Sequence, residues 1–245
     1  MRIAILSDVH ANLEALEVCL QSIRVSSVDA VVCLGDVVGY GADHNACCDL
    51  IRESTLFCLL GNHDAAVIGV MDTDFYYPAA RQALFRTRES LSEDNFRWLY
   101  SLPYSHQAPG VGFFHGAPVL PSGFYYVVRP KDAEAHLQLL ARLEPYTFIG
   151  HSHLTKQFLL SPNGVQSLNS RKISAHPGKD ERYIINVGSV GQPRDKDPRA
   201  CYGLFDSHTG AFRHVRLEYD HHRAAEKIRA AGLDQKFATR LAAGT

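Results

Sequence analysis

Long apolar runs are absent from this 245-residue sequence, and no stretch reaches the roughly 20 apolar residues that a membrane-spanning helix needs. A strong charge of either sign is also absent, because the formal net charge is -1. A surface that coats nucleic acid or an anionic membrane is therefore not expected. Internal repeats and low-complexity linkers are missing as well, which favours a single domain over residues 1–245. The oligomeric state is left open.

The sequence lacks the regular cysteine spacing of a disulfide-rich or zinc-binding protein. The six cysteines are irregularly spaced, form no CxxC pair and mostly fall in apolar runs: Cys19, Cys33, Cys47, Cys48, Cys58 and Cys201. This pattern favours reduced thiols in a protein core over a disulfide framework or a cysteine zinc site. The first residues lead directly into a short apolar run and lack the long apolar region of a signal peptide. Together these features favour a cytoplasmic location.

Strand and helix patterns alternate in the first 60 residues. Short apolar runs predict strands at Ile3 to Leu6, Ala30 to Leu34 and Thr55 to Leu60. Helices are expected after the first strand, where Asn12 can cap the chain, and at about Asp43 to Glu53. Such alternation implies parallel strands whose carboxyl ends share one sheet edge. We therefore expect Asp8, Asp36 and Asn62 to converge.

The rest of the chain gives further predicted elements. Helices are expected at Ala79 to Thr87, Glu93 to Ser101, Lys131 to Leu143, Asp220 to Ala231 and Asp234 to Ala243. Strands are expected at Phe113-Phe114 and Tyr146 to Ile149, and then at Phe158 to Leu160, Val165 to Leu168, Tyr183 to Val187, Tyr202 to Asp206 and Phe212 to Leu217. We expect the last five strands to be antiparallel and to form a second sheet. The stretch from Ser170 to Arg182 reads as a loop.

Five short polar segments each follow a predicted strand: Asp8-Val9-His10, Gly35-Asp36, Gly61-Asn62-His63-Asp64, His115-Gly116 and Gly150-His151-Ser152-His153. Any one of these segments alone could equally be a turn, a helix cap or a pair of exposed loop histidines without a metal-binding role. Together they supply the carboxylates, imidazoles and amide oxygen that bind a pair of divalent cations about 3.5 to 4 Å apart. In Asp8-Val9-His10 and His151-Ser152-His153, the two polar residues are two positions apart. This spacing suggests extended segments, in which alternate side chains point the same way.

In this order, the five segments resemble the motifs of the calcineurin-like metallophosphoesterase superfamily, in particular its small bacterial and archaeal phosphodiesterase-like members. The resemblance implies an α/β fold, a four-layer α/β/β/α sandwich of two mixed sheets flanked by helices. It implies hydrolysis of a phosphoester, preferably a phosphodiester, by water that two metal ions activate. A phosphomonoesterase, a protein phosphatase, a dinucleoside polyphosphate hydrolase and a non-catalytic scaffold of the same fold remain alternatives. The expected substrate is small and phosphorylated, with nucleotides included.

The resemblance also implies a role for each residue. Asp8, His10 and His153 would hold one metal ion, Asn62, His115 and His151 the other, and Asp36 would bridge them. His63 would face the scissile phosphate as electrostatic stabiliser and general acid, and Asp64 would orient its ring. Mixed nitrogen and oxygen ligands suit Mn, Fe, Zn, Co or Ni better than Ca. The chain departs from the family where Ala11 replaces a common glycine and where some branches have Glu in place of Asp64.

Two groups of residues remain open. The segment Asn186 to Arg194 also resembles a family stretch, and Arg194 is either a phosphate ligand or an exposed turn residue. The aromatic residues Phe75, Tyr76, Tyr77 and Trp98 form either a wall over a nucleobase or a helix-packing core. The other histidines lack a ligand context and are expected in the surface or the core: His44, His106, His136, His176, His208, His214, His221 and His222.

Overall fold

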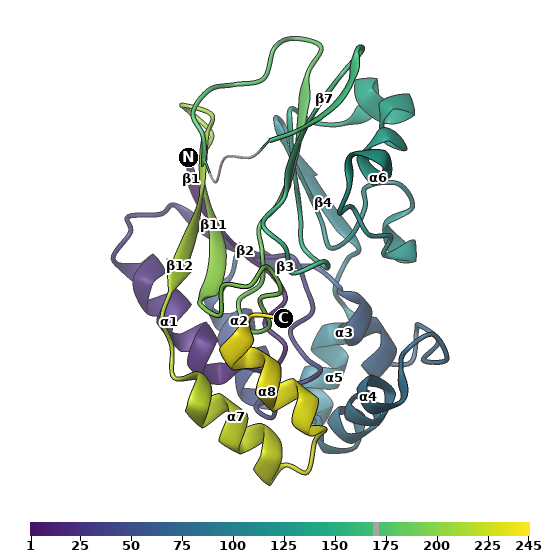
Figure 1. Cartoon of the computed structure of the whole chain (residues 1–245), viewed down its shortest axis with the longest axis vertical. Helices are drawn as coiled ribbons and strands as arrows, with labels where there is room; N and C mark the ends of the chain where they lie inside the picture. Colours follow the sequence, from purple (N-terminus) through teal and green to yellow (C-terminus); the bar gives the residue numbers. More distant parts are fainter. Residues whose placement is uncertain (169–171) are drawn as a thin grey trace.

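Two six-stranded sheets form the centre of the molecule in the computed structural model, which describes residues 1–168 and 172–245. The strand order is β3-β2-β1-β11-β12-β9 in the first sheet, called sheet A. In the second sheet, called sheet B, it is β4-β5-β6-β10-β7-β8. Both sheets are mixed, because parallel and antiparallel neighbours occur in each. Figure 1 shows the two sheets side by side, with helices outside them.

Sheet A contains the three parallel strands expected from the first 60 residues. Its strands are β1 (Arg2–Leu6), β2 (Ala30–Cys33), β3 (Phe57–Cys58), β9 (Lys172–Ile173), β11 (Ala200–Asp206) and β12 (Ala211–Leu217). The parallel pairs are β1 with β2 and β2 with β3. The other edge of β1 pairs antiparallel with β11, so the first strand lies in the interior of the sheet.

Sheet B is built from the middle of the chain. Its strands are β4 (Ser105–Ala108), β5 (Val111–Phe114), β6 (Tyr146–Ile149), β7 (Gln157–Ser161), β8 (Gly164–Ser167) and β10 (Arg182–Asn186). Parallel pairing of β5 with β6, and of β6 with β10, places three more strand ends at one edge. The loops that carry His115 and His151 leave from this edge.

Helices cover the outer face of each sheet (Figure 1). The longer helices are α1 (Leu13–Arg24), α2 (His44–Ser54), α4 (Pro78–Ser90), α5 (Glu93–Tyr100), α7 (His221–Ala230) and α8 (Gln235–Ala243). The short ones are α3 (Asn62–Val67), α6 (Pro130–Glu134) and the 3-10 turns Pro121–Gly123 and Leu137–Arg142. Asn12 caps α1 by accepting a hydrogen bond from the Ala15 amide, as its position suggested. Among the described residues, no helix is long and apolar enough to cross a membrane.

The hydrophobic core has three parts, which define the four layers. In β1, Ile3 and Ile5 face sheet B, whereas Ala4 and Leu6 face the helices, because successive strand residues point to opposite faces. The core between the sheets contains Phe148 and Phe205. A third part lies between sheet B and α6. The predicted four-layer sandwich of two mixed sheets is therefore confirmed.

Three sequence predictions about elements were wrong. The last five predicted strands do not form one sheet, because β11 and β12 pair with β1, whereas β7, β8 and β10 join sheet B. The helix predicted at Lys131 to Leu143 divides into α6 and a 3-10 turn. The predicted loop from Ser170 to Arg182 includes β9, while Ser170 and Arg171 lie outside the described residues. Local apolar pattern does not encode which sheet a strand joins, since both sheets bury the same residue types.

Candidate metal centre

Strand ends from both sheets deliver the seven predicted ligands to one place. Asp8 follows β1, Asp36 follows β2, and Asn62 is the first residue of α3 after β3. His115 follows β5, and both His151 and His153 lie in the loop after β6. All seven side chains are buried. The carboxyl ends of parallel strands share an edge, and the two sheets place these edges against each other.

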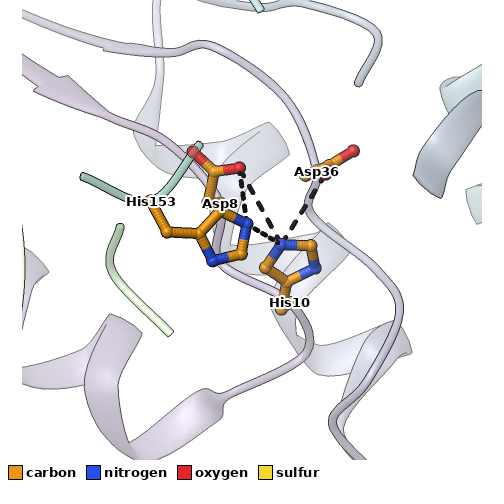
Figure 2. Close-up of side chains that lie close together, drawn as sticks. All are labelled: Asp8, His10, Asp36 and His153. Atoms are coloured by element: carbon orange, nitrogen blue, oxygen red, sulfur yellow. Dashed lines mark hydrogen bonds and ion pairs between the residues drawn. The ribbon is translucent and has the colours of Figure 1, made fainter. Parts of the chain in front are cut away.

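The first ligand group consists of Asp8, His10, Asp36 and His153, whose ligand atoms all lie within 4.8 Å of one another. Figure 2 shows these four side chains close together, with His10 linked to each of the other three. Nε2 of His153 lies 3.3 Å from Oδ1 of Asp8, and Nε2 of His10 lies 3.6 Å from Oδ2 of Asp36. Two carboxylates and two imidazoles therefore face one point.

The second ligand group consists of Asp36, His115 and His151. Nε2 of His115 lies 3.3 Å from Oδ2 of Asp36 and 3.2 Å from the amide oxygen Oδ1 of Asn62. Asn62 thus adds an oxygen to this group. Asp36 belongs to both groups, and the same oxygen, Oδ2, faces a histidine of each.

The backbone at Asp8, His10, His151 and His153 is not extended, although the spacing of these residues suggested extended segments. Five of the ligands have a positive φ: Asp8 (55°), His10 (50°), Asp36 (55°), His151 (65°) and His153 (59°). This left-handed conformation is uncommon for residues other than glycine and costs free energy, so the surrounding structure must enforce it. The side chains converge as expected, but through tight turns at the strand ends rather than through alternation along a strand.

Hydrogen bonds fix the tautomer of three histidines. Nδ1 of His10 lies 3.1 Å from the Val38 carbonyl oxygen, and Nδ1 of His115 lies 2.9 Å from that of Leu34. Nδ1 of His153 lies 2.6 Å from the Gln192 carbonyl oxygen. A carbonyl only accepts, so each Nδ1 carries the hydrogen and each Nε2 is directed at the ligand cluster.

Charge is concentrated on Asp36 and His115. Burial by itself raises the pKa of Asp36, but the combined attraction of His115, His63 and His10 outweighs it and holds this pKa well below its ordinary value. Burial in turn lowers the pKa of His115, but the combined attraction of Asp36, Asp8 and Asp64 outweighs it and raises this pKa to about 9. In the metal-free protein this pair is therefore charged at neutral pH. A cation at the same place would displace the proton from His115.

The donor set fits divalent cations. Burial, followed by repulsion from His153, keeps the pKa of His10 well below its ordinary value, so this ring is neutral. Its Nε2 lies 3.1 Å from Nε2 of His153, so two lone pairs face each other. Oδ1 of Asp8 is buried and has no hydrogen-bond partner. Buried acceptors without donors are costly, and a cation would satisfy all three atoms.

Asp64 does not orient the ring of His63, contrary to the sequence-based expectation. Its Oδ2 accepts hydrogen bonds from the amides of Asp36 (2.8 Å) and Gly61 (3.1 Å), and its Oδ1 accepts one from Val38 (3.1 Å). Nδ1 of His63 is buried without a partner. Asp64 instead ties the loop after β2 to the loop after β3, because its side chain is short and faces both backbones.

Gly61 allows this close approach. A Cβ atom at Gly61 would lie 2.1 Å from Oδ1 of Asp36 and 2.2 Å from the Asp36 amide nitrogen. Non-bonded contacts of a Cβ atom are never this short in proteins, so only glycine fits at this position. The same Oδ1 accepts a hydrogen bond from the His63 amide at 2.8 Å, which leaves Oδ2 for the ligand cluster.

The comparisons with known proteins agree with this geometry. A family model described as the calcineurin-like phosphoesterase superfamily domain matches residues 1–210. The chain belongs to the calcineurin-like phosphoesterase superfamily. It is therefore a metallophosphoesterase, and its buried Asp and His clusters are consistent with binding of divalent metal by this family.

Relatives of this phosphoesterase span its whole length. An uncharacterized protein of Methanocaldococcus jannaschii is 35% identical over 246 residues, which cover 99% of this chain and 98% of the relative. The crystal structure of a metallophosphoesterase from Sphaerobacter thermophilus is 35% identical with a TM-score of 0.84, covering 100% of this chain and 99% of that one. A hypothetical protein of Pyrococcus horikoshii, 17% identical, shares the fold with a TM-score of 0.78 over 100% and 98% of the two chains.

A cavity of about 270 Å³ adjoins the ligand cluster of the phosphoesterase. Asn62, His63 and His151 line its inner end, and Arg194 also lines it. Burial lowers the pKa of His63 to about 4 against the attraction of Asp36, so its ring is neutral at pH 7. A cavity of about 370 Å³ at the opposite edge of sheet A, near Arg2, contains none of the ligands.

Several residues of this cavity were missed by sequence reasoning. Tyr40 contacts the His63 ring with centroids 4.4 Å apart, and Tyr126 stacks on His151 at 4.0 Å. The hydroxyl of Tyr76 accepts a 2.5 Å hydrogen bond from Nδ2 of Asn62. Of the proposed aromatic wall, Phe75, Tyr76 and Tyr77 line the cavity, whereas Trp98 packs against the core. Only the aromatic content of the 75–77 segment signalled this role.

The remaining histidines stay outside the ligand groups found among residues 1–168 and 172–245. His44 and His176, for example, contact Ser90 and Tyr146 respectively. All six cysteines are buried thiols, in agreement with the core role expected from their spacing. Burial and the neighbouring carboxylates keep the pKa of Cys47 well above its ordinary value. The Cys47 thiol is therefore unreactive at neutral pH.

Proposed function

We propose that this metallophosphoesterase hydrolyses a small phosphodiester with two divalent metal ions bound at the two ligand groups. The observation that carries the proposal is the position of Asp36, whose Oδ2 faces His10 of one group and His115 of the other. A single carboxylate shared in this way is the bridging ligand that a dinuclear site needs. We assign Asp8, His10 and His153 to one ion and Asn62, His115 and His151 to the other.

The chemistry of the ligand atoms limits which metal ions the site would bind. The groups combine imidazole nitrogen with carboxylate and amide oxygen and include no thiolate. Such a set suits Mn, Fe, Zn, Co or Ni, and Mn is the metal we would test first. When bound, the ions supply positive charge that neutralises phosphoryl oxygens and activates a water for attack.

The protein's own residues have two tasks in this proposal. The hydrogen bonds from Nδ1 to carbonyls hold three imidazoles in place, so little reorganisation is needed when the ions and the substrate bind. His63 lines the cavity next to Asn62 and donates a hydrogen bond to the phosphate. A nearby anionic phosphate favours the protonated ring, so His63 can also protonate the leaving oxygen.

The cavity lining favours a diester over a monoester. A diester carries one negative charge and a second organic group, whereas a monoester carries close to two charges at neutral pH. Among the described residues, Arg194 is the only cationic side chain that lines the cavity, and most of the lining is apolar or aromatic. This surface is suited to the second organic group, which supports a small phosphodiester, nucleotides included.

The experiment compares bis(p-nitrophenyl) phosphate with p-nitrophenyl phosphate, using Mn²⁺-loaded protein whose metal content is measured. We expect two ions per chain and faster release of nitrophenol from the diester. His63→Ala should keep both ions and lose activity by about 10²- to 10³-fold, because it removes a hydrogen-bond donor and acid from the phosphate. The exposed His208→Ala serves as the control and should retain activity.

The outcomes separate the parts of the proposal. Folded, metal-loaded protein that cleaves neither ester would overturn hydrolysis. One ion per chain with full activity would overturn the dinuclear assignment. Unchanged activity of His63→Ala at intact metal content would overturn the role of His63.

A further inference from the structure

We propose that the cavity beside the ligand groups binds a planar aromatic group of the substrate, so that aryl and nucleoside phosphoesters are preferred over alkyl ones. This inference rests on the proposed function, because the ligand groups form the phosphate end of the same site. It adds the chemical class of the organic group and the residues that select it.

Aromatic side chains make up half of the cavity lining. They come from three separate segments of the chain: Tyr40, Phe75, Tyr76, Tyr77, Phe124 and Tyr126. Met71 adds a polarisable side chain. Within residues 1–168 and 172–245, no carboxylate and no lysine line the cavity. Such a surface gains free energy from a flat, apolar ring and little from a hydroxylated or charged group.

Three of these rings are exposed. Phe75 is 87% exposed, Tyr126 is 55% exposed and Tyr77 is 47% exposed. Exposed aromatic residues that line a cavity together are unusual for a surface without a ligand. Tyr126 lies flat on His151, with an angle of 20° between the rings, so an aromatic face adjoins a metal ligand directly. A ring bound here would lie next to the phosphate site.

Arg194 supplies charge that no carboxylate neutralises. Among the described residues it forms no ion pair, and its Nε atom is buried without a hydrogen-bond partner. Its guanidinium lies 5.6 Å from the centre of the Tyr40 ring, and its backbone amide bonds to the His153 carbonyl oxygen. The group is thus held between the aromatic lining and the ligand groups. The Tyr40 hydroxyl is a neutral partner of this group, and a phosphate oxygen would supply the negative charge that it does not have.

The test measures binding without turnover. Phenylphosphonate and methylphosphonate differ in one planar ring, and neither can be hydrolysed as an ester. We expect calorimetry on the Mn²⁺-loaded protein to show roughly tenfold tighter binding of phenylphosphonate, in line with the strength of aromatic stacking. The 5′-phosphonate analogue of adenosine, measured beside them, distinguishes a nucleoside from a simple aryl group.

Matched variants locate the ring. Tyr126→Ala and Phe75→Ala should each reduce the ratio of the two phosphonate affinities by at least about threefold, because each removes part of the aromatic wall. Phe75→Ala is the second variant in case loss of Tyr126 disturbs His151. Tyr125→Ala is the control, since Tyr125 is the sequence neighbour, is 56% exposed and does not line the cavity. Its ratio should stay that of the unaltered protein.

Each outcome of the phosphonate measurements either supports or overturns the proposed aromatic cavity. Equal affinities for the two phosphonates, or no binding of either, would overturn the aromatic cavity. A preference that survives both cavity variants, or that Tyr125→Ala abolishes, would also overturn it. If the ring preference is found but no ester is hydrolysed, the cavity assignment stands and the proposed hydrolysis fails.

Discussion

The Nε2 atoms of His10 and His153 lie 3.1 Å apart, although 143 positions separate the two residues in the sequence. Both rings direct Nδ1 at a backbone carbonyl, so each Nε2 presents a lone pair. Two lone pairs at this distance repel unless a cation lies between or beside them. The folded chain therefore holds these rings in a costly arrangement that metal binding relieves.

Metal removal should lower thermal stability for this reason. We expect the melting temperature to fall after treatment with a chelator and to return when Mn²⁺ is added. At a free ion concentration 100 times the dissociation constant, the gain for one site is about 3 kcal/mol. His153→Gln should show a smaller response to Mn²⁺. A melting curve that is identical with and without metal would contradict this interpretation of the cluster.

Gly61→Ala should damage the metal site without unfolding the protein. The added Cβ would lie 2.1 Å from Oδ1 of Asp36, so the residue that the two ligand groups share must move. We expect a loss of about 1 to 3 kcal/mol in unfolding free energy and a clear drop in metal content. Gly178→Ala is the matched control, because its nearest neighbour is the flexible Glu181 side chain at 3.1 Å. Equal metal content in the two variants would reject the argument.

Tyr76→Phe should weaken metal binding through the orientation of Asn62. The Tyr76 hydroxyl accepts a hydrogen bond from Nδ2 of Asn62, which turns Oδ1 toward the ligand groups. Without the hydroxyl, the amide can rotate, and we expect metal affinity to fall by about 10- to 100-fold. Competition with a fluorescent chelator measures this. Tyr100→Phe, which alters an exposed tyrosine, should change nothing.

Lys227→Met should destabilise the fold by about 1 to 2 kcal/mol. Nζ of Lys227 lies 2.6 Å from Oε1 of the buried Glu14 and 2.8 Å from Oδ2 of Asp43, so the variant leaves a buried carboxylate without its main partner. Arg223→Ala is the comparison, because its side chain also reaches Glu14, at 3.3 Å, but is 67% exposed. Its effect in urea unfolding should be smaller, since exposed pairs contribute little.

Asp197→Asn should alter the dependence of stability on pH. The hydrogen bond from Arg199 lowers the pKa of Asp197 from 3.8 to about 2, so ionised Asp197 stabilises the folded state. A lowered pKa gives stability that is present above pH 3.8 and lost as the pH falls toward 2. The variant should cost less than about 1 kcal/mol at pH 7, given solvent screening, and progressively less below pH 4. Unfolding in urea at pH 7 and pH 3 would reveal a constant difference if this is wrong.

The sequence predicted the parallel part of sheet A well, because its strands alternate with helices of clear periodicity. The start of the helix after Asn12 and both ends of the strand Tyr146–Ile149 were predicted where the structure has them. The sheet to which β11 belongs was missed, since pairing with β1 joins residues that are far apart in the chain. Short elements such as α3 carry too few residues for a periodic signal.

The sequence predicted which residues form the candidate metal site better than it predicted their conformations and contacts. Strand ends and motif order were enough to gather seven ligands, because parallel strands share an edge. The left-handed conformation of His10 and His151 is not encoded by their residue type. The role of Asp64 was missed because its partners are backbone amides, which every sequence contains. Tyr126 had no motif at all.

The contacts of Asp8 also govern when this centre can assemble in a living cell. Its backbone carbonyl oxygen accepts hydrogen bonds from the Ser189 hydroxyl (2.8 Å) and the Gly191 amide (3.0 Å). Asp8 is therefore synthesised early, but these two hydrogen bonds form only after the segment that contains Ser189 and Gly191 has been synthesised. Ion loading becomes a late event of biosynthesis, and a prematurely terminated product should be unable to retain metal.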